Sequence, residues 1–118
     1  MITTGYLAKT DTYPKTDILI AVTRYKPRYH HEPEWKPTLA PSPALLWDYK
    51  EGRIDWETYE KRYREEMTAP EPQQLILYYA NRVRSGQVFR LLCIEREPPC
   101  HRFILKDIIE EVTKIKWS

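Results

Sequence analysis

Cysteine, histidine and arginine stand side by side in the stretch LLCIEREPPCHR, residues 91–102. An amphipathic pattern that predicts a helix begins directly at Cys100, His101 and Arg102. A thiol at the start of a helix lies near unpaired amide groups and the positive end of the helix dipole, which lower a thiol pKa. The tripeptide can therefore supply a thiolate nucleophile or an anion cradle. The alternative is an ordinary helix start, with His101 and Arg102 in solvent.

Two further residues of the same stretch carry reactive groups. Glu95 follows an apolar run, where its carboxylate can act as a general base, orient an arginine, or form an ion pair at the rim of a sheet. Cys93 lies within the apolar run, so we interpret it as a core residue and Cys100 as a rim residue, not as a pair. A disulfide between them would require Cα atoms within about 7 Å.

A zinc site is another alternative for the two cysteines and His101, with His30 and His31 as added ligands. Their spacing matches no common zinc pattern, and a cysteine in a buried strand points poorly toward a shared metal. We therefore predict no metal ligands. The chain has no Gly-rich phosphate loop, no H-E-x-x-H motif and no serine nucleophile elbow, and we predict no cofactor.

A basic segment, TRYKPRYHH at residues 23–31, forms a second candidate site. Basic residues between aromatic ones can hold phosphates and stack nucleic-acid bases. Arg24 and Lys26 can bind a small anionic ligand together with Arg102, or the whole segment can bind nucleic acid. A solvated loop is the third interpretation. Arg24 is the most informative member because it lies closest to the end of a predicted strand.

Alternating strands and helices are expected to position these residues. Short apolar runs predict strands at 2–8, 17–25 and 87–95. Helical spacing predicts helices at 42–52, 55–67, 73–86 and 100–115, with Ser42 and Asp55 as the N-caps of the first two. The connection 26–43 holds five prolines, which are expected to exclude regular structure there. An aromatic stripe on the helix 55–67 is interpreted as core or as a partner interface; it consists of Trp56, Tyr59, Tyr63 and Met67.

Buried apolar strands separated by helices predict an α/β fold. We expect a small, mainly parallel sheet flanked by helices in three layers, formed by a single domain over residues 1–118. In such sheets ligands bind beyond the carboxyl ends of the strands. This rule selects residues 24–31 and 95–102, which would meet at one rim of the sheet if their strands are parallel neighbours.

Composition restricts the class of protein. The chain is 42% hydrophobic and 31% charged, which is typical of globular proteins, and its net charge of +2 does not by itself imply nucleic-acid binding. No apolar run approaches the roughly 20 residues of a membrane helix, and the N-terminus lacks a signal-peptide pattern. We expect a cytoplasmic protein with reduced thiols and no membrane partner. Many charged and proline residues with few glycines hint at a thermophilic source.

The motifs resemble those of a known family. LLCIEREPPCHRFIL resembles the signature of domain-of-unknown-function family 488, in which a strand ending in Cys and an acidic residue leads to Cys-His-Arg and a helix. VTRYKP and WKPTLAPSPALLWDYKEGRIDWETYEKRYREEM look like its YeaO-like branch, so the resemblance covers about residues 17–110. It implies an α/β fold and a site around Arg24, Glu95, Cys100, His101 and Arg102, but no reaction. Thr23 stands where the family has an aspartate, so a mechanism that uses this carboxylate is not implied.

The favoured interpretation is a positively charged pocket at the strand ends that binds a small anionic ligand, such as one that carries phosphate. One alternative is a thiol-dependent enzyme with Cys100 as nucleophile and His101 as proton carrier. Others are a nucleic-acid-binding module that uses residues 23–31, and an interaction protein that uses its aromatic surface. Whether the chain is an enzyme, and its oligomeric state, stay open.

Overall fold

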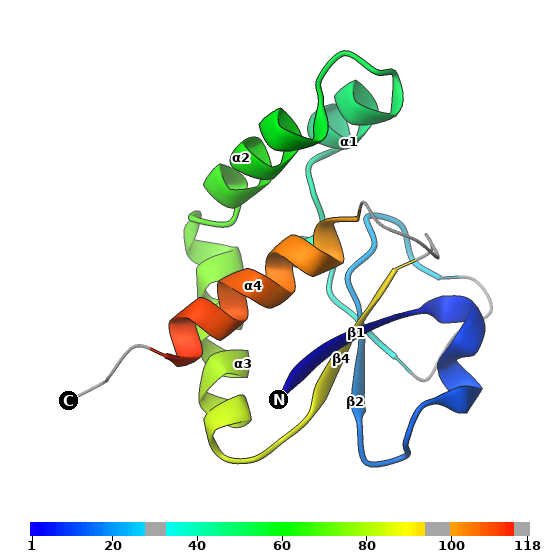
Figure 1. Ribbon diagram of the computed structural model, residues 1–118, viewed down its shortest axis with the longest axis vertical. Helices are drawn as coiled ribbons and strands as arrows, with labels where there is room; N and C mark the ends of the chain where they lie inside the picture. Colours follow the sequence, from blue (N-terminus) through cyan, green and yellow to red (C-terminus); the bar gives the residue numbers. More distant parts are fainter. Residues whose placement is uncertain (28–32, 94–99, 115–118) are drawn as a thin grey trace.

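The structure is a computed structural model that describes residues 1–27, 33–93 and 100–114 (Figure 1). The strands are β1 (Ile2–Tyr6), β2 (Ile18–Ala21), β3 (Glu34–Trp35) and β4 (Phe89–Cys93). The α-helices are α1 (Pro43–Lys50), α2 (Trp56–Glu66), α3 (Pro70–Arg84) and α4 (His101–Thr113). Two 3₁₀ segments, η1 (Leu7–Thr12) and η2 (Pro37–Leu39), complete the described elements.

The four strands form one parallel sheet in the order β1-β4-β2-β3. The strand that precedes Cys100 thus lies beside the strand that precedes Arg24, because β4 pairs with β2 from Ile18↔Phe89 to Ala21↔Leu92. The predicted α/β fold with a small parallel sheet is confirmed. Since the strands are parallel, their carboxyl ends meet at one edge, as the site prediction requires.

The two faces of the sheet are covered differently. Side chains alternate between the faces along each strand. Ile18 and Ile20 of β2 pack into the main core beneath the α-helices, whereas Leu19 and Ala21 join a small cluster with Leu7 of η1. The layer on the second face is therefore a 3₁₀ segment and not an α-helix (Figure 1).

Helix α4 forms the centre of the main core. It crosses the sheet over β1 and β4 and packs against α3 and α2 (Figure 1). The apolar face predicted for the last helix is buried, with Ile104, Leu105, Ile108 and Ile109 at i, i+4 spacing. The start of this helix is consequently fixed against the ends of the strands.

An ion pair holds the second face of the sheet together. The guanidinium of Arg90 in β4 lies 2.9 Å from the carboxylate of Asp17, just before β2, and donates to the Thr4 carbonyl of β1 at 2.8 Å. Its carbon lies 4.1 Å from the centroid of the Tyr13 ring. One side chain of β4 thus contacts both neighbouring strands and the segment that covers them.

The helix pair α1 and α2 stands beyond the carboxyl ends of the strands (Figure 1). Ser42 caps α1 by accepting from the Leu45 amide at 3.2 Å, and Asp55 caps α2 by accepting from the Thr58 amide at 2.8 Å, so both predicted caps are confirmed. Glu66, the last residue of α2, accepts from the Ser42 amide at 2.8 Å and from its hydroxyl at 2.5 Å. The start of α1 is therefore hydrogen-bonded to the end of α2.

The structure corrects two expectations, one for the connection 26–43 and one for the start of α3. The connection 26–43 contains the short edge strand β3 and the 3₁₀ segment η2, because the residues between Pro33 and Pro37 can pair with β2 without requiring a proline amide. Helix α3 begins at Pro70, three residues before the predicted start at residue 73. Prolines are tolerated there because the backbone N–H groups of the first helical turn have no hydrogen-bond acceptor within the helix.

We predict that Gly5→Ala destabilises the fold through Tyr13. A methyl group at Gly5 would lie 2.6 Å from Tyr13 Cζ, and the Tyr13 hydroxyl also accepts from the Tyr6 amide at 2.9 Å, so the ring cannot move without losing that bond. The expected loss of unfolding free energy in urea is about 1–3 kcal/mol. In a Tyr13→Ala background the same substitution should cost much less; an equal cost in both backgrounds would show that the ring is not responsible.

Candidate functional site

A cavity of about 520 Å³ lies where the ends of β2 and β4 meet α1, α2 and the start of α4. Thr23, Arg24 and Tyr25 line it after β2, and Cys93, Cys100 and His101 line it at β4 and α4. Its other walls are made by Pro41, Leu46, Tyr49, Lys50, Gly52, Ile54, Trp56 and Tyr59. The volume lies in the range of small-molecule sites, and the two segments selected by the strand-end rule share it.

Two thiols and an imidazole form a compact cluster in this cavity. Cys100 Sγ and Cys93 Sγ are hydrogen-bonded at 2.8 Å, and the two cysteines are not joined as a disulfide. His101 Nδ1 lies 3.7 Å from Cys100 Sγ and 3.8 Å from Cys93 Sγ. All three side chains are almost fully buried, with 1% of Cys93 and 5% of Cys100 and His101 exposed.

The orientation of the His101 ring follows from its second nitrogen. Nε2 lies 2.6 Å from the carbonyl oxygen of Val22, the residue after β2. A carbonyl only accepts, so Nε2 carries a proton and donates it. In the neutral ring Nδ1 is then the unprotonated nitrogen, and it faces both sulfurs. His101 can therefore take a proton from either thiol.

The surroundings of Cys100 favour its thiolate. The hydrogen bond between the thiols of Cys100 and Cys93 is the largest influence that lowers the pKa of Cys100, and burial opposes it. His101 lowers it further, as does the backbone N–H of Arg102 in the first turn of α4, although Cys100 makes no regular N-cap hydrogen bond. Together they lower the pKa of the Cys100 thiol from 9.0 to about 5. Cys100 is thus expected to be ionised at neutral pH.

Cys93 is buried in the core as predicted, but the interpretation of Cys100 as a separate rim residue was wrong. Both are buried, and both line the cavity. Alternation along β4 explains the result, because Cys93 shares the helix-covered face with Phe89 and Leu91, where α4 begins. His101 and Arg102 are also buried and do not form a solvated helix start, since only 2% of Arg102 is exposed.

Arg24 lines the cavity but is engaged by the chain itself. Its Nε and Nη2 donate to the Pro41 carbonyl at 3.0 and 2.9 Å, and Nη2 also lies 3.3 Å from the Ala40 carbonyl. Arg24 therefore fixes the segment that leads into α1, which carries part of the cavity wall. Thr23 beside it is buried, and its hydroxyl donates to the Tyr25 carbonyl at 2.7 Å.

The remaining predicted site residues lie elsewhere. Lys26 is exposed and does not line the cavity. Arg102 does not line it either, and its guanidinium carbon lies 4.7 Å from the centroid of the Phe103 ring. Glu95 and residues 28–31 of the basic segment lie outside the described residues. The site thus brings together Arg24, Cys100 and His101 but leaves out Lys26 and Arg102.

Aromatic residues form a wall that the sequence analysis did not assign to a site. Tyr49 of α1 contacts Trp56 and Tyr59 of α2, with ring centroids 5.6 and 4.8 Å apart, and Trp56 stacks on Tyr59 at 5.0 Å. Tyr63 continues this row to His101, 5.6 Å away. Burial raises the pKa of Tyr63, whose hydroxyl donates to the Leu39 carbonyl, so Tyr63 stays neutral and supports the ring of His101. The helical stripe signalled an apolar face, but not that half of it faces a cavity.

The sequence matches one family along nearly its whole length. The profile of DUF488-N3a, described as the active DUF488-N3 subclade, matches residues 3–113. The chain belongs to the DUF488 family. No curated protein and no solved structure matches it. The predicted family membership is therefore confirmed, and the roles of the residues in this DUF488 protein have to be argued from its own geometry.

The cysteine–histidine cluster of this DUF488 protein also offers three potential metal ligands. Within the described residues, Cys93, Cys100 and His101 have ligand atoms within 4.8 Å of one another. Zinc with bonds of about 2.3 Å to sulfur and about 2.0 Å to nitrogen would place two sulfurs about 3.8 Å apart. The sulfur–nitrogen distances fit such an ion, but the sulfur–sulfur distance of 2.8 Å does not. The cluster therefore suits thiol chemistry better than zinc binding, although Cys93 points toward it, contrary to the sequence analysis.

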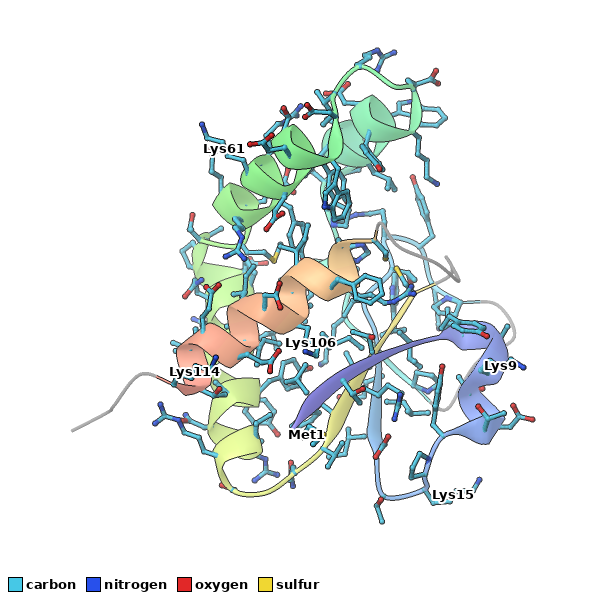
Figure 2. All side chains as sticks on the ribbon, viewed as in Figure 1. Met1, Lys9, Lys15, Lys61, Lys106 and Lys114 are labelled. Carbon is cyan, nitrogen blue, oxygen red and sulfur yellow. The ribbon has the colours of Figure 1, made fainter. Side chains whose placement is uncertain are left out.

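Among the described residues of this DUF488 protein, Lys50 is the lysine that lines the cavity. Figure 2 shows the labelled lysines on separate parts of the molecule, namely Lys9, Lys15, Lys61, Lys106 and Lys114. Lys106 is paired with Glu110 at 2.6 Å.

None of the helices in the described part of the chain has the length and apolar content to cross a lipid bilayer.

We predict that Arg24→Gln lowers the unfolding free energy by about 1–3 kcal/mol, because charge-assisted hydrogen bonds to two backbone carbonyls are lost. Chemical denaturation measures the change. Lys26→Gln is the matched control, since Lys26 is exposed and should shift stability by less than about 0.5 kcal/mol. Equal effects of the two substitutions would mean that the carbonyl contacts of Arg24 do not stabilise the fold.

Proposed function

We propose that the protein is a thiol-dependent enzyme, with Cys100 as the nucleophile and His101 as the proton carrier. The observation that supports this most directly is the placement of Cys100 Sγ, 3.7 Å from His101 Nδ1 and 2.8 Å from Cys93 Sγ, on the wall of a cavity of about 520 Å³. A nucleophile beside a base that is itself oriented by a third group is the arrangement of covalent catalysis. Here the third group is the Val22 carbonyl.

The chemical step follows from the positions of the protons. The proton released by Cys100 passes to His101 Nδ1, which faces the sulfur, so His101 carries the proton while Cys100 is the thiolate nucleophile. The thiolate attacks an electrophilic atom of the bound substrate and forms a covalent bond to it. The leaving group departs with the electron pair of the broken bond and receives the proton from Nδ1. No carboxylate from the described residues lines the cavity, and His101 Nδ1 lies 3.7 Å from the attacking sulfur, so His101 is assigned the role of proton donor.

The walls of the cavity indicate the kind of substrate. Tyr49, Trp56 and Tyr59 form a continuous aromatic surface on the side of the helix pair, and Leu46 and Ile54 extend it. Aromatic and aliphatic walls of this size favour a small organic molecule with an apolar or aromatic part. The substrate class is thus a small electrophile and not a polymer.

An anionic ligand is the second candidate. Arg24 and Lys50 are the cationic residues that line the cavity in the described part of the chain. Because Arg24 already donates to two carbonyls, Lys50 is the residue with more freedom to meet an anionic group of the substrate. Calorimetric titration with inorganic phosphate tests this proposal, and Lys50→Gln should weaken any binding. Nucleic-acid binding by residues 23–31 stays a prediction.

The enzyme proposal is tested by the alkylation rate of Cys100 as a function of pH. Iodoacetamide reacts with thiolates, and peptide mass spectrometry assigns the modified cysteine. With a pKa of about 5 the thiolate predominates above that pH, so the rate should rise near pH 5 and be level by pH 7. An ordinary thiol would instead gain reactivity through about pH 8.5.

His101→Gln serves as the comparison variant. Loss of the imidazole removes one of the groups that lower the pKa of Cys100, so the midpoint of the alkylation profile should move to higher pH. A profile of the unmodified protein centred at pH 8 or above, or one that His101→Gln leaves in place, would remove the support for an activated nucleophile.

A further inference from the structure

A second thiol rests against the proposed nucleophile, and the mechanism above gives it no chemical step. Cys93 Sγ lies 2.8 Å from Cys100 Sγ, which is closer than two sulfur atoms that merely pack together. Cys93 is fixed at the end of β4, in register with Tyr6 of β1, and 1% of it is exposed. A structural core cysteine would be expected among aliphatic side chains, whereas this one shares a cavity with a thiol and an imidazole.

The position of Cys93 restricts the substrate. Its sulfur lies within reach of one atom of the intermediate, the sulfur of Cys100. Such an attack expels a group that is attached to Cys100 through another sulfur, because a thiolate is then the leaving group. A group attached through carbon would have to be released by attack on that carbon instead. Cys93 can therefore release the bound group when the intermediate is a mixed disulfide between Cys100 and the substrate.

We propose that the cavity catalyses thiol–disulfide exchange on a small organic disulfide with an aromatic or apolar part, with Cys100 as the attacking cysteine and Cys93 as the resolving cysteine. This inference rests on the proposed function and narrows its substrate class. The nearly equal distances from His101 Nδ1 to the two sulfurs, 3.7 and 3.8 Å, allow one imidazole to serve both thiols in turn.

In the first step the Cys100 thiolate attacks one sulfur of the substrate. The substrate's S–S bond breaks, a bond forms between Cys100 Sγ and that sulfur, and the first organic thiolate leaves. It takes the proton from His101 Nδ1 and departs as a thiol. His101 is then neutral, with its Nε2 proton still on the Val22 carbonyl.

In the second step neutral His101 accepts the proton of Cys93. The Cys93 thiolate attacks Cys100 Sγ, a bond forms between the two cysteines, and the second organic thiolate leaves with the proton returned by Nδ1. One disulfide has been reduced to two thiols, and the two cysteines have been oxidised to one disulfide, so both electrons are accounted for. A dithiol reductant is then required to restore the cysteines.

The experiment compares Cys93→Ser with Cys100→Ser, which form a matched pair. Each reduced, folded protein is mixed with 4,4′-dithiodipyridine, a small aromatic disulfide, and both the released thiopyridone and the intact mass are measured. The unmodified chain should release two equivalents of thiopyridone and lose only two hydrogens in mass. Cys93→Ser should release one equivalent and retain the second as a stable adduct. Cys100→Ser should react more slowly, by roughly tenfold or more, because its remaining thiol is not the activated one.

Several results would overturn the proposal. An unmodified chain that retains two adducts would mean that the cysteines react independently. A Cys93→Ser adduct that disappears as fast as the intermediate of the unmodified chain would show that Cys93 does not resolve it. Thiols that become reactive only after a chelator has removed stoichiometric zinc would assign the cluster to a metal.

Failure of the disulfide-exchange proposal can be distinguished from failure of the thiol-enzyme proposal. Serine at position 93 keeps a hydrogen-bond donor beside Cys100, so the alkylation profile of Cys93→Ser with iodoacetamide reports on the nucleophile alone. An activated profile without adduct trapping would reject the disulfide proposal and leave the thiol enzyme intact. An unreactive Cys100 would reject both.

Discussion

The hydrogen bond from His101 Nε2 to the Val22 carbonyl is the contact on which the rest of the site depends. It spans 2.6 Å, is buried, and joins the first residue of α4 to the residue that follows β2. By occupying one nitrogen, it determines that the other faces the two sulfurs. The carbonyl is available there because β2 and β4 are parallel neighbours whose ends coincide. This one hydrogen bond therefore couples the position of the start of α4 relative to β2 with the position of the proton on His101.

The buried setting makes that link chemically useful. In the proposed mechanism a thiolate lies beside a protonated His101, and opposite charges attract each other more strongly in a low-dielectric cavity than in water. The aromatic row from Trp56 to Tyr63 excludes solvent on one side, and the charged head of Arg24 is turned toward backbone carbonyls. The cavity therefore offers a polarised cluster within largely apolar walls. The positively charged strand-end pocket expected from the sequence stays a prediction, with Arg24 and Lys50 as its cationic lining residues.

The sequence was sufficient to predict much of the fold. Apolar runs, the caps Ser42 and Asp55, and the face of α4 were all recognisable, and the strand-end rule placed Arg24 and Cys100 on one cavity. The pairing of Cys93 with Cys100 was missed because a wholly apolar strand does not reveal which face each residue takes. The prediction that Arg24 binds a ligand stays a prediction, and its hydrogen bonds to two carbonyls of a later segment were not foreseen because a sequence does not show such tertiary contacts. The aromatic wall could not be predicted because it depends on how α1 and α2 are oriented relative to the sheet, which is a property of the tertiary structure.

The ion pair on the opposite face of the sheet has a consequence for the cavity. Arg90 and Cys93 belong to the same strand but face opposite sides, because they are three residues apart. A slip of β4 by one residue would turn Arg90 into the apolar core and turn Cys93 away from His101. Burying an unpaired guanidinium is costly, so the pairing of Arg90 with Asp17 excludes the slipped register. A charge on one side of the sheet thereby specifies where a sulfur atom lies on the other.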